Sequence, residues 1–309
     1  MSSTDPTDRG RGDDLPRRPG SKTPLRARMR LSVAAPASTA LAAAAVLILA
    51  VPACASSSST SGGSSAAGGS PAAHVLVLRA MPVGTVTFGA ASRGHLTVHA
   101  DMFGLTPGSA HNVDLLIPGR SSVQFSSLTA DDVGQANRTL QSNFTGQMPR
   151  GSRLLIRMGA QGGGVATEPV ASTGQLSGSA RGPYRLIPVE VSSGGASFGT
   201  LRGRATVSYN RSRDTLTVTI DASGFTPGSH AAHIHLGSCA RQGPVKYMLK
   251  DLTADSQGNI VHAVQAFTHV TTPIPASGWY LNIHQGNSNN ILSNGQPTVL
   301  FRPLLCADV

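Results

Sequence analysis

The chain has 309 residues, of which 4% are aromatic and 13% are charged, and its formal net charge is +10. Residues 1–53 carry 8 Lys/Arg and 4 Asp/Glu, so the rest carries 25 − 8 = 17 basic and 15 − 4 = 11 acidic residues, a net charge of +6. Basic runs interleaved with aromatic residues are absent, which argues against nucleic-acid binding, and the moderate positive field suits a small anion or plain solvation.

The first segment has the composition of a secretory signal. Residues 33–53 form an apolar run that follows Arg26, Arg28 and Arg30, and small residues lead into Cys54. This order of basic, apolar and small residues is typical of signal peptides. The end of the run resembles the lipobox of bacterial lipoproteins, which implies a lipid on Cys54. A transmembrane anchor is the alternative, because the run is nearly long enough to span a bilayer.

A complete signal can be read from Met29 onward, so the true start of translation could be Met29, within the signal segment of residues 1–53. Residues 54–73 are rich in Ser and Gly, a composition typical of a flexible tether. We therefore expect an exported protein of a bacterial cell envelope that is lipid-anchored through Cys54, either on the outer face of the cytoplasmic membrane or extracellularly.

Past the tether, the sequence has the texture of an all-β protein. Residues 95–102, HLTVHADM, and 215–222, TLTVTIDA, alternate apolar and polar side chains with the period of half-buried strands. Short runs of this kind are separated by Gly, Pro, Asn and Asp, and no amphipathic helix of about ten residues or more follows Cys54. The pattern favours β-sandwiches with Greek-key or immunoglobulin-like topology.

An internal repeat predicts two such sandwiches. Three segments of the first half match three of the second half in the same order: 96–115 with 216–235, 126–135 with 250–259, and 148–159 with 274–286. We expect a degenerate sandwich at 74–172, a linker at 173–183 and a second sandwich at 184–309.

Histidines distinguish the two copies. The second copy has His230, His233 and His235 in GSHAAHIHL and a further histidine, His284, in WYLNIHQG, where the first copy has Arg157. Alternation along a strand places Ala232, Ile234 and Leu236 on the core face and the histidines at 233 and 235 on the outer face. The same logic turns His284 outward.

If the two strands are neighbours, the imidazoles of His233, His235 and His284 converge on one surface, which suits copper or zinc. The alternative is that they are ordinary polar surface residues. His111, in the first copy, has no partner histidine and is given no role.

Cysteine parity predicts a disulfide. Three cysteines are present, and if lipid modifies Cys54, an even pair remains, Cys239 and Cys306. Such a pair in an exported protein suggests a disulfide, and two free thiols are the alternative.

The residues of the second copy resemble those of Cu,Zn superoxide dismutases. GFTPGSHAAHIHLGSC, NIHQGNSNN and FRPLLCADV are similar to that family's ligand, third-histidine and C-terminal segments. The resemblance implies copper ligands at His233, His235 and His284, and a structural histidine at His230. It also implies that residues 185–209 form the opening hairpin of the second sandwich. The same resemblance implies a Cys239–Cys306 disulfide and, at Arg302, a catalytic arginine that guides superoxide.

The same region departs from the dismutases in one respect. Residues 240–259 contain no histidine and no long zinc loop, so zinc is not expected. The short connection is more similar to chordin-type (CHRD) domains, whose HAAHIH and YVNVH patterns the chain also resembles. That family implies a related sandwich without an established reaction.

Two functions follow as hypotheses. The first is an exported, lipid-anchored copper protein with dismutase-like chemistry, in which superoxide or another small anion would be the partner. The second is a non-catalytic envelope module that binds a protein, a glycan or a metal ion, or has a structural role. A hydrolase finds no support, because neither a Gly-x-Ser-x-Gly elbow nor a clear carboxylate pair is present.

Overall fold

A computed structural model describes residues 72–92, 95–146, 148–159, 168–178, 181–189, 192–193 and 196–309. The expected signal segment of residues 1–53 and the lipidation residue Cys54 lie outside the described residues. Within the described part, the regular elements are β-strands and one 3-10 turn, η1 (Val299–Phe301). This confirms the all-β fold class. No helix in these ranges has the length and apolar character needed to cross a membrane.

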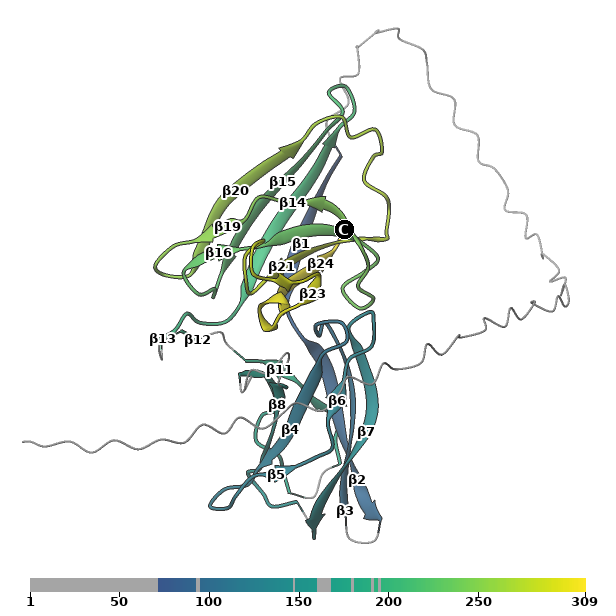
Figure 1. The fold of residues 1–309 in the computed structure, drawn as a ribbon, viewed down its shortest axis with the longest axis vertical. Helices are drawn as coiled ribbons and strands as arrows, with labels where there is room; N and C mark the ends of the chain where they lie inside the picture. The colour runs from purple at the N-terminus through teal and green to yellow at the C-terminus, as the bar shows by residue number, and fades with distance from the viewer. Residues whose placement is uncertain are drawn as a thin grey trace, which may run out of the picture. The chain divides into compact units, whose positions relative to one another are not determined.

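The C-terminal body is built on one antiparallel sheet of eight strands (Figure 1). In sheet order its strands are β18 (Val245–Met248), β17 (Ala232–Leu236), β21 (Trp279–His284), β24 (Pro303–Asp308), β1 (Ala72–Ala80), β14 (Arg202–Asn210), β15 (Thr215–Ser223) and β20 (Asn259–Phe267). Strands β1 and β24 share only two residue pairs, whereas β14 and β15 are paired over nine residues. The short pairing divides the sheet into two halves.

Both halves contribute to one hydrophobic core. Val218 and Ile220 of β15 are fully buried, and so are Ile234 of β17 and Leu281 of β21. Burying an aliphatic side chain of this size stabilises the fold by about 1.5–3 kcal/mol. Because the two halves bury their side chains against each other, the sheet curls over on itself and forms a β-sandwich.

The N-terminal body is a second sandwich made of two sheets. One has the order β10 (Tyr184–Arg185), β2 (Val83–Ser92), β3 (His95–Phe103) and β7 (Gln135–Thr145). The other has the order β11 (Ile187–Pro188), β9 (Pro169–Ser172), β8 (Arg153–Met158), β4 (Ala110–Leu116) and β5 (Val123–Gln124), with β6 (Leu128–Thr129) also paired to β4. Val98 and Leu140 of the first sheet pack with Leu115 and Ile156 of the second.

Three small two-stranded sheets complete the described part. They are β12 (Ser192–Ser193) with β13 (Ala196–Ser197), β16 (Gly228–His230) with β19 (Leu252–Ala254), and β22 (Leu292–Ser293) with β23 (Gln296–Pro297).

Strand β1, and the short strands β10 and β11, each pair with the body other than the one that the sequence analysis assigned them to. Strand β1 lies in the C-terminal sheet, where Leu76 pairs with Ala205, although the repeat assigns it to the first copy. Conversely, β10 and β11 pair with β2 and β9 of the N-terminal body. The expectation that residues 185–209 form the opening hairpin of the second sandwich is therefore wrong in its first part, and only β14 from this stretch lies in the C-terminal sheet.

Candidate metal centre

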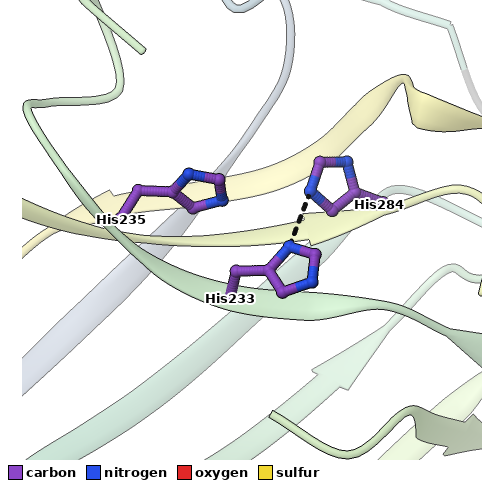
Figure 2. A group of neighbouring side chains, drawn as sticks. All are labelled: His233, His235 and His284. Atoms are coloured by element: carbon purple, nitrogen blue, oxygen red, sulfur yellow. Dashed lines mark hydrogen bonds between the residues drawn. The ribbon is translucent and has the colours of Figure 1, made fainter. Parts of the chain in front are cut away.

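Strands β17 and β21 bring three histidines together. They are antiparallel neighbours in which His235 is opposite Tyr280 and His233 is opposite Asn282. His284, at the end of β21, lies on the same face as these residues. One ring nitrogen from each of His233, His235 and His284 lies within 4.8 Å of the others, and Figure 2 shows the three rings converging.

The spacing of the nitrogens is close to that of a metal site. Nδ1 of His233 and Nε2 of His284 are 3.3 Å apart, the contact drawn in Figure 2. Two nitrogens bound to one tetrahedral ion at about 2.1 Å are about 3.4 Å apart. The pair already has this separation, and the ligand nitrogen of His235 lies within 4.8 Å of both.

Backbone carbonyls determine which nitrogen each ring offers. Nδ1 of His235 donates to the Gly243 carbonyl at 2.8 Å, and Nδ1 of His284 donates to the Phe301 carbonyl at 2.6 Å. Both rings therefore carry their lone pair on Nε2. The Nε2 atom of His235 is buried and has no hydrogen-bond partner among the described residues. A buried acceptor without a partner is costly, and a metal ion would satisfy it. Second contacts of this kind orient the histidine ligands of metal sites.

The electrostatics keep the rings neutral. Burial lowers the pKa of His233 to about 4, with a further lowering by His235 and an opposing effect of Asp251. Burial also lowers the pKa of His284 to about 3, and it lowers the pKa of His235. At pH 7 all three imidazoles are therefore in the uncharged form that binds metal ions.

The histidines lie on the expected face, but that face is covered. Ile234 points into the core, and the rings at 233, 235 and 284 are on the opposite side of the sheet with exposed fractions of only 4%, 5% and 0%. The Tyr280 ring stacks on His235 with centroids 4.8 Å apart, and Phe301 packs on His284 at 4.6 Å. The expectation of exposed outer-face histidines is thus wrong about burial, because these covering side chains come from β21 itself and from η1.

His230 lies beside the centre rather than in it. Its Nδ1 is 3.1 Å from the His284 carbonyl, and its Nε2 is 2.8 Å from the Thr226 carbonyl. The Phe225 ring meets it edge-on, with centroids 4.8 Å apart. His230 thus ties the turn before β16 to the backbone of a candidate ligand.

The predicted disulfide is confirmed. Cys239, in the loop after β17, is bonded to Cys306 of β24. Cys306 pairs across the sheet with Asn282, which is next to His233. The Cys239 N–H also donates to the Asp308 carboxylate at 2.7 Å. The loop that contains the anchoring carbonyl of Gly243 is therefore fixed to the last strand.

Arg302 is placed differently from the histidines. It is 4% exposed, and its terminal nitrogens donate to the carbonyls of Pro169, Val170 and Val189 at 3.3–3.5 Å. Burial lowers its pKa to about 10, so it keeps its charge at pH 7. This arrangement commits the guanidinium ends to backbone carbonyls of the N-terminal body, and it gives no support to the expected role in guiding an anion.

The N-terminal copy has an ion pair where the C-terminal copy has imidazoles. Aligning the core pair Val113–Ile156 with Ala232–Ile283 places Asp114 at the position of His233 and Arg157 at that of His284. Nε of Arg157 is 3.2 Å from the Asp114 carboxylate. The charged pair thus occupies the site of the 3.3 Å contact between the two histidines.

His111 then corresponds to His230, a role that the sequence did not suggest. Its Nε2 is 2.7 Å from Oγ of Ser109, which donates to the Thr106 carbonyl. Burial lowers its pKa to about 4.

Sequence reasoning also missed Tyr280 and Gly243. The stacking of Tyr280 on a histidine could have been inferred from the alternation of WYLNIH, but the anchor at Gly243 depends on a loop conformation that no local pattern indicates.

The comparisons identify the domain that holds this centre. No curated protein matches the chain. The family model of the CHRD domain matches residues 185–290, which include His230, His233, His235, His284 and Cys239. Residues 185–290, with all three histidines of the centre, therefore form a CHRD domain.

Proposed function

We propose that the CHRD domain is a metal-binding module and that His233, His235 and His284 hold one copper ion. The observation that carries the proposal is the convergence of three neutral, buried imidazoles, one of which has a ring nitrogen without a partner among the described residues. Three imidazoles suit copper and zinc alike, and the general order of affinities favours copper over zinc at such a site.

The arrangement of the site favours a binding or structural role over a catalytic one. The centre is covered by Tyr280 and Phe301, and Arg302 is engaged with backbone carbonyls, so the arginine expected to guide an anion is already committed to the protein backbone. CHRD domains, as a family, also fit such a role better than an enzymatic one. Copper here would be held, stored or used to rigidify the module.

Superoxide dismutation is the second candidate. The three-histidine set and the Cys239–Cys306 disulfide favour it, because both match what the dismutase resemblance implies. Copper bound there would supply one-electron redox chemistry. The protein's own residues would fix the imidazoles and keep bulk water from the centre.

One experiment tests metal binding. The full chain is compared with a variant in which His233, His235 and His284 are all replaced by Ala, and binding of Cu²⁺ and Zn²⁺ is measured by calorimetry and by metal analysis. We expect one copper per wild-type chain and none above background in the variant. His99→Ala is the matched control, since His99 is an exposed histidine of the other body. Equal copper binding by the triple variant would refute the site.

The same samples separate the two functions. The decay of superoxide is followed with copper-loaded wild type, the triple variant and an equal amount of free copper. A binding module gives wild-type decay no faster than the free-metal control. Turnover above that control, lost in the triple variant, would replace the binding role with the dismutase one.

We also propose that the protein is exported and held at the membrane by a lipid on Cys54, as the signal segment suggests. Replacing Cys54 with Ser should move the protein from the detergent-rich phase to the aqueous phase in a phase-separation assay. An unchanged partition would argue for the transmembrane alternative.

A further inference from the structure

Met248 lies across from one of the candidate ligands. It ends β18, the edge strand of the eight-stranded sheet, and it is the direct cross-strand partner of His233. The preceding pair is Tyr247 with Ile234, and Tyr247 packs against the hydrophobic core. Because side chains alternate between the faces of a strand, Met248 projects from the same face as His233.

The hydrogen-bond pattern makes this pair a close one. The Leu249 N–H donates to the Ala232 carbonyl at 3.0 Å. In an antiparallel ladder, that bond flanks the pair His233–Met248 and makes it a non-hydrogen-bonded pair. Side chains of such pairs are the closest in a sheet, with Cα atoms about 4.5 Å apart. Met248 and His233 are thus close neighbours on one face of the sheet, and Met248 carries its thioether on a flexible side chain.

Core packing does not explain this methionine. Met248 is 63% exposed, whereas the other methionines of the described part are buried: Met81, Met102, Met148 and Met158. An exposed Met on an edge strand has no packing role that Leu or Thr would not fill.

The chemistry of the thioether is specific. Thioether sulfur is a soft ligand that selects Cu(I), whereas zinc sites are built from thiolate, imidazole and carboxylate. Asp251, whose charge acts on His233, accepts hydrogen bonds from the N–H and hydroxyl of Ser288. It is therefore engaged in holding the loop after β21.

We propose that Met248 is a fourth ligand of the centre and that it makes the site selective for Cu(I) over Zn²⁺. This inference rests on the proposed metal-binding function of His233, His235 and His284. The three imidazoles supply affinity, and the methionine at the sheet edge supplies the discrimination between the two ions.

The test uses the full chain and two leucine substitutions on one strand. Met248→Leu removes the sulfur and keeps the size of the side chain. Val245→Leu is the control, because Val245 is also exposed, lies on the same strand and is opposite His235. Cu(I) affinity is measured without oxygen by competition with a chromophoric chelator, and Zn²⁺ affinity by competition with a fluorescent one.

We expect Met248→Leu to weaken Cu(I) binding by about tenfold or more, the scale seen when a supporting contact of a metal is lost. Zn²⁺ binding should be unchanged, and Val245→Leu should match wild type for both ions. X-ray absorption of the Cu(I) form should show a sulfur neighbour that Met248→Leu lacks.

Unchanged Cu(I) affinity in Met248→Leu, or a copper shell without sulfur in the wild type, would overturn the inference. The triple histidine variant keeps this outcome distinct from failure of the site. If that variant loses both metals while Met248→Leu loses neither, the metal centre stands without the methionine. If the triple variant retains both metals, the proposed function itself fails.

Discussion

Contacts beyond the centre hold the ring of His235 in place. His235 is bonded to the Gly243 carbonyl, and the Gly243 N–H donates to the Tyr280 hydroxyl at 3.1 Å. The Tyr280 ring in turn stacks on His235, so one tyrosine restrains the imidazole from its face and, through Gly243, from its edge. Burial raises the pKa of Tyr280 to about 12, which keeps the hydroxyl protonated. The ring of His235 is therefore oriented before any ion arrives, which lowers the entropic cost of binding.

The neutral, buried histidines make stability depend on pH. In the unfolded chain an imidazole takes a proton near pH 6.5, whereas burial lowers the pKa of His233 and His111 to about 4 and that of His284 to about 3 in the folded protein. Between pH 6.5 and about 4 the unfolded state binds protons that the folded state does not. Lowering the pH through this range must therefore lower the free energy of unfolding, by about 1.4 kcal/mol per pH unit for each such histidine.

We expect the metal-free wild type to lose stability from pH 7 to pH 4.5 more steeply than a variant with His233→Asn and His284→Asn. Urea unfolding at several pH values, in the presence of a chelator, measures both slopes. Parallel pH profiles for the two proteins would contradict the assignment of these two buried imidazoles.

At the level of residues, the sequence predicted the centre but not its surroundings. The spacing of His233 and His235 and the pattern before His284 indicated the correct face of two strands, because alternation is a local property of a strand. Burial of that face depends on Phe301 and on the loop of Gly243, which are brought in by chain reversals far from the pattern. The same limit explains why the partners of Arg302 could not be predicted, since these carbonyls are more than 110 residues away in sequence.

Among the elements, β1 has the least expected role. Its residues precede the matched CHRD segment, yet Leu76 and Leu78 are 7% and 3% exposed and belong to the core of the C-terminal body. The repeat pattern correctly indicated two sandwiches in sequence order. It could not indicate which body each terminal strand joins, because an alternating strand fits either sheet and only the connections decide.

This placement predicts that a change in β1 weakens the CHRD domain. Leu78→Ala should cost about 2–5 kcal/mol through a cavity in the core. Val75→Ala, at a 69% exposed position of the same strand, should cost no more than about 0.5 kcal/mol. Trp279 is the only tryptophan of the chain and lies buried in β21, so its fluorescence during urea unfolding reports on this body directly. If Leu78→Ala leaves the Trp279 transition unchanged, β1 does not belong to the C-terminal core.

In the whole molecule, the described residues between 72 and 309 belong to one compact unit. The N-terminal body takes its strands from one contiguous stretch of chain, β2 to β11, whereas the C-terminal body combines β1 with strands from β14 onward, so the N-terminal body is inserted between two parts of the C-terminal one. Hydrogen bonds of side chains also link the two bodies. Gln242 donates to the Leu105 carbonyl at 2.7 Å, and Gln135 donates to the Ala240 carbonyl at 2.8 Å. The domain division expected from the repeat therefore describes two cores rather than two separable pieces.

Arg302 offers the sharpest test of whether the two cores unfold together. Its guanidinium donates hydrogen bonds to the carbonyls of Pro169, Val170 and Val189. Arg302 also follows Phe301 in the chain, and the Phe301 carbonyl orients His284. Arg302→Met keeps much of the buried volume but leaves these carbonyls without that donor, at about 1–3 kcal/mol for each one that finds no other partner. In the wild type, hydrogen exchange in β9 and Trp279 fluorescence should report one common urea transition. In Arg302→Met, protection in β9 should be lost at lower urea than the Trp279 signal, and copper affinity should fall because Phe301 is less firmly held.

Gln285→Ala is the control. Gln285 also contacts the N-terminal body, through the Glu168 carboxylate at 3.3 Å, but this contact is exposed and contributes little. Coincident transitions in Arg302→Met would show that the buried arginine is dispensable for the coupling of the two cores.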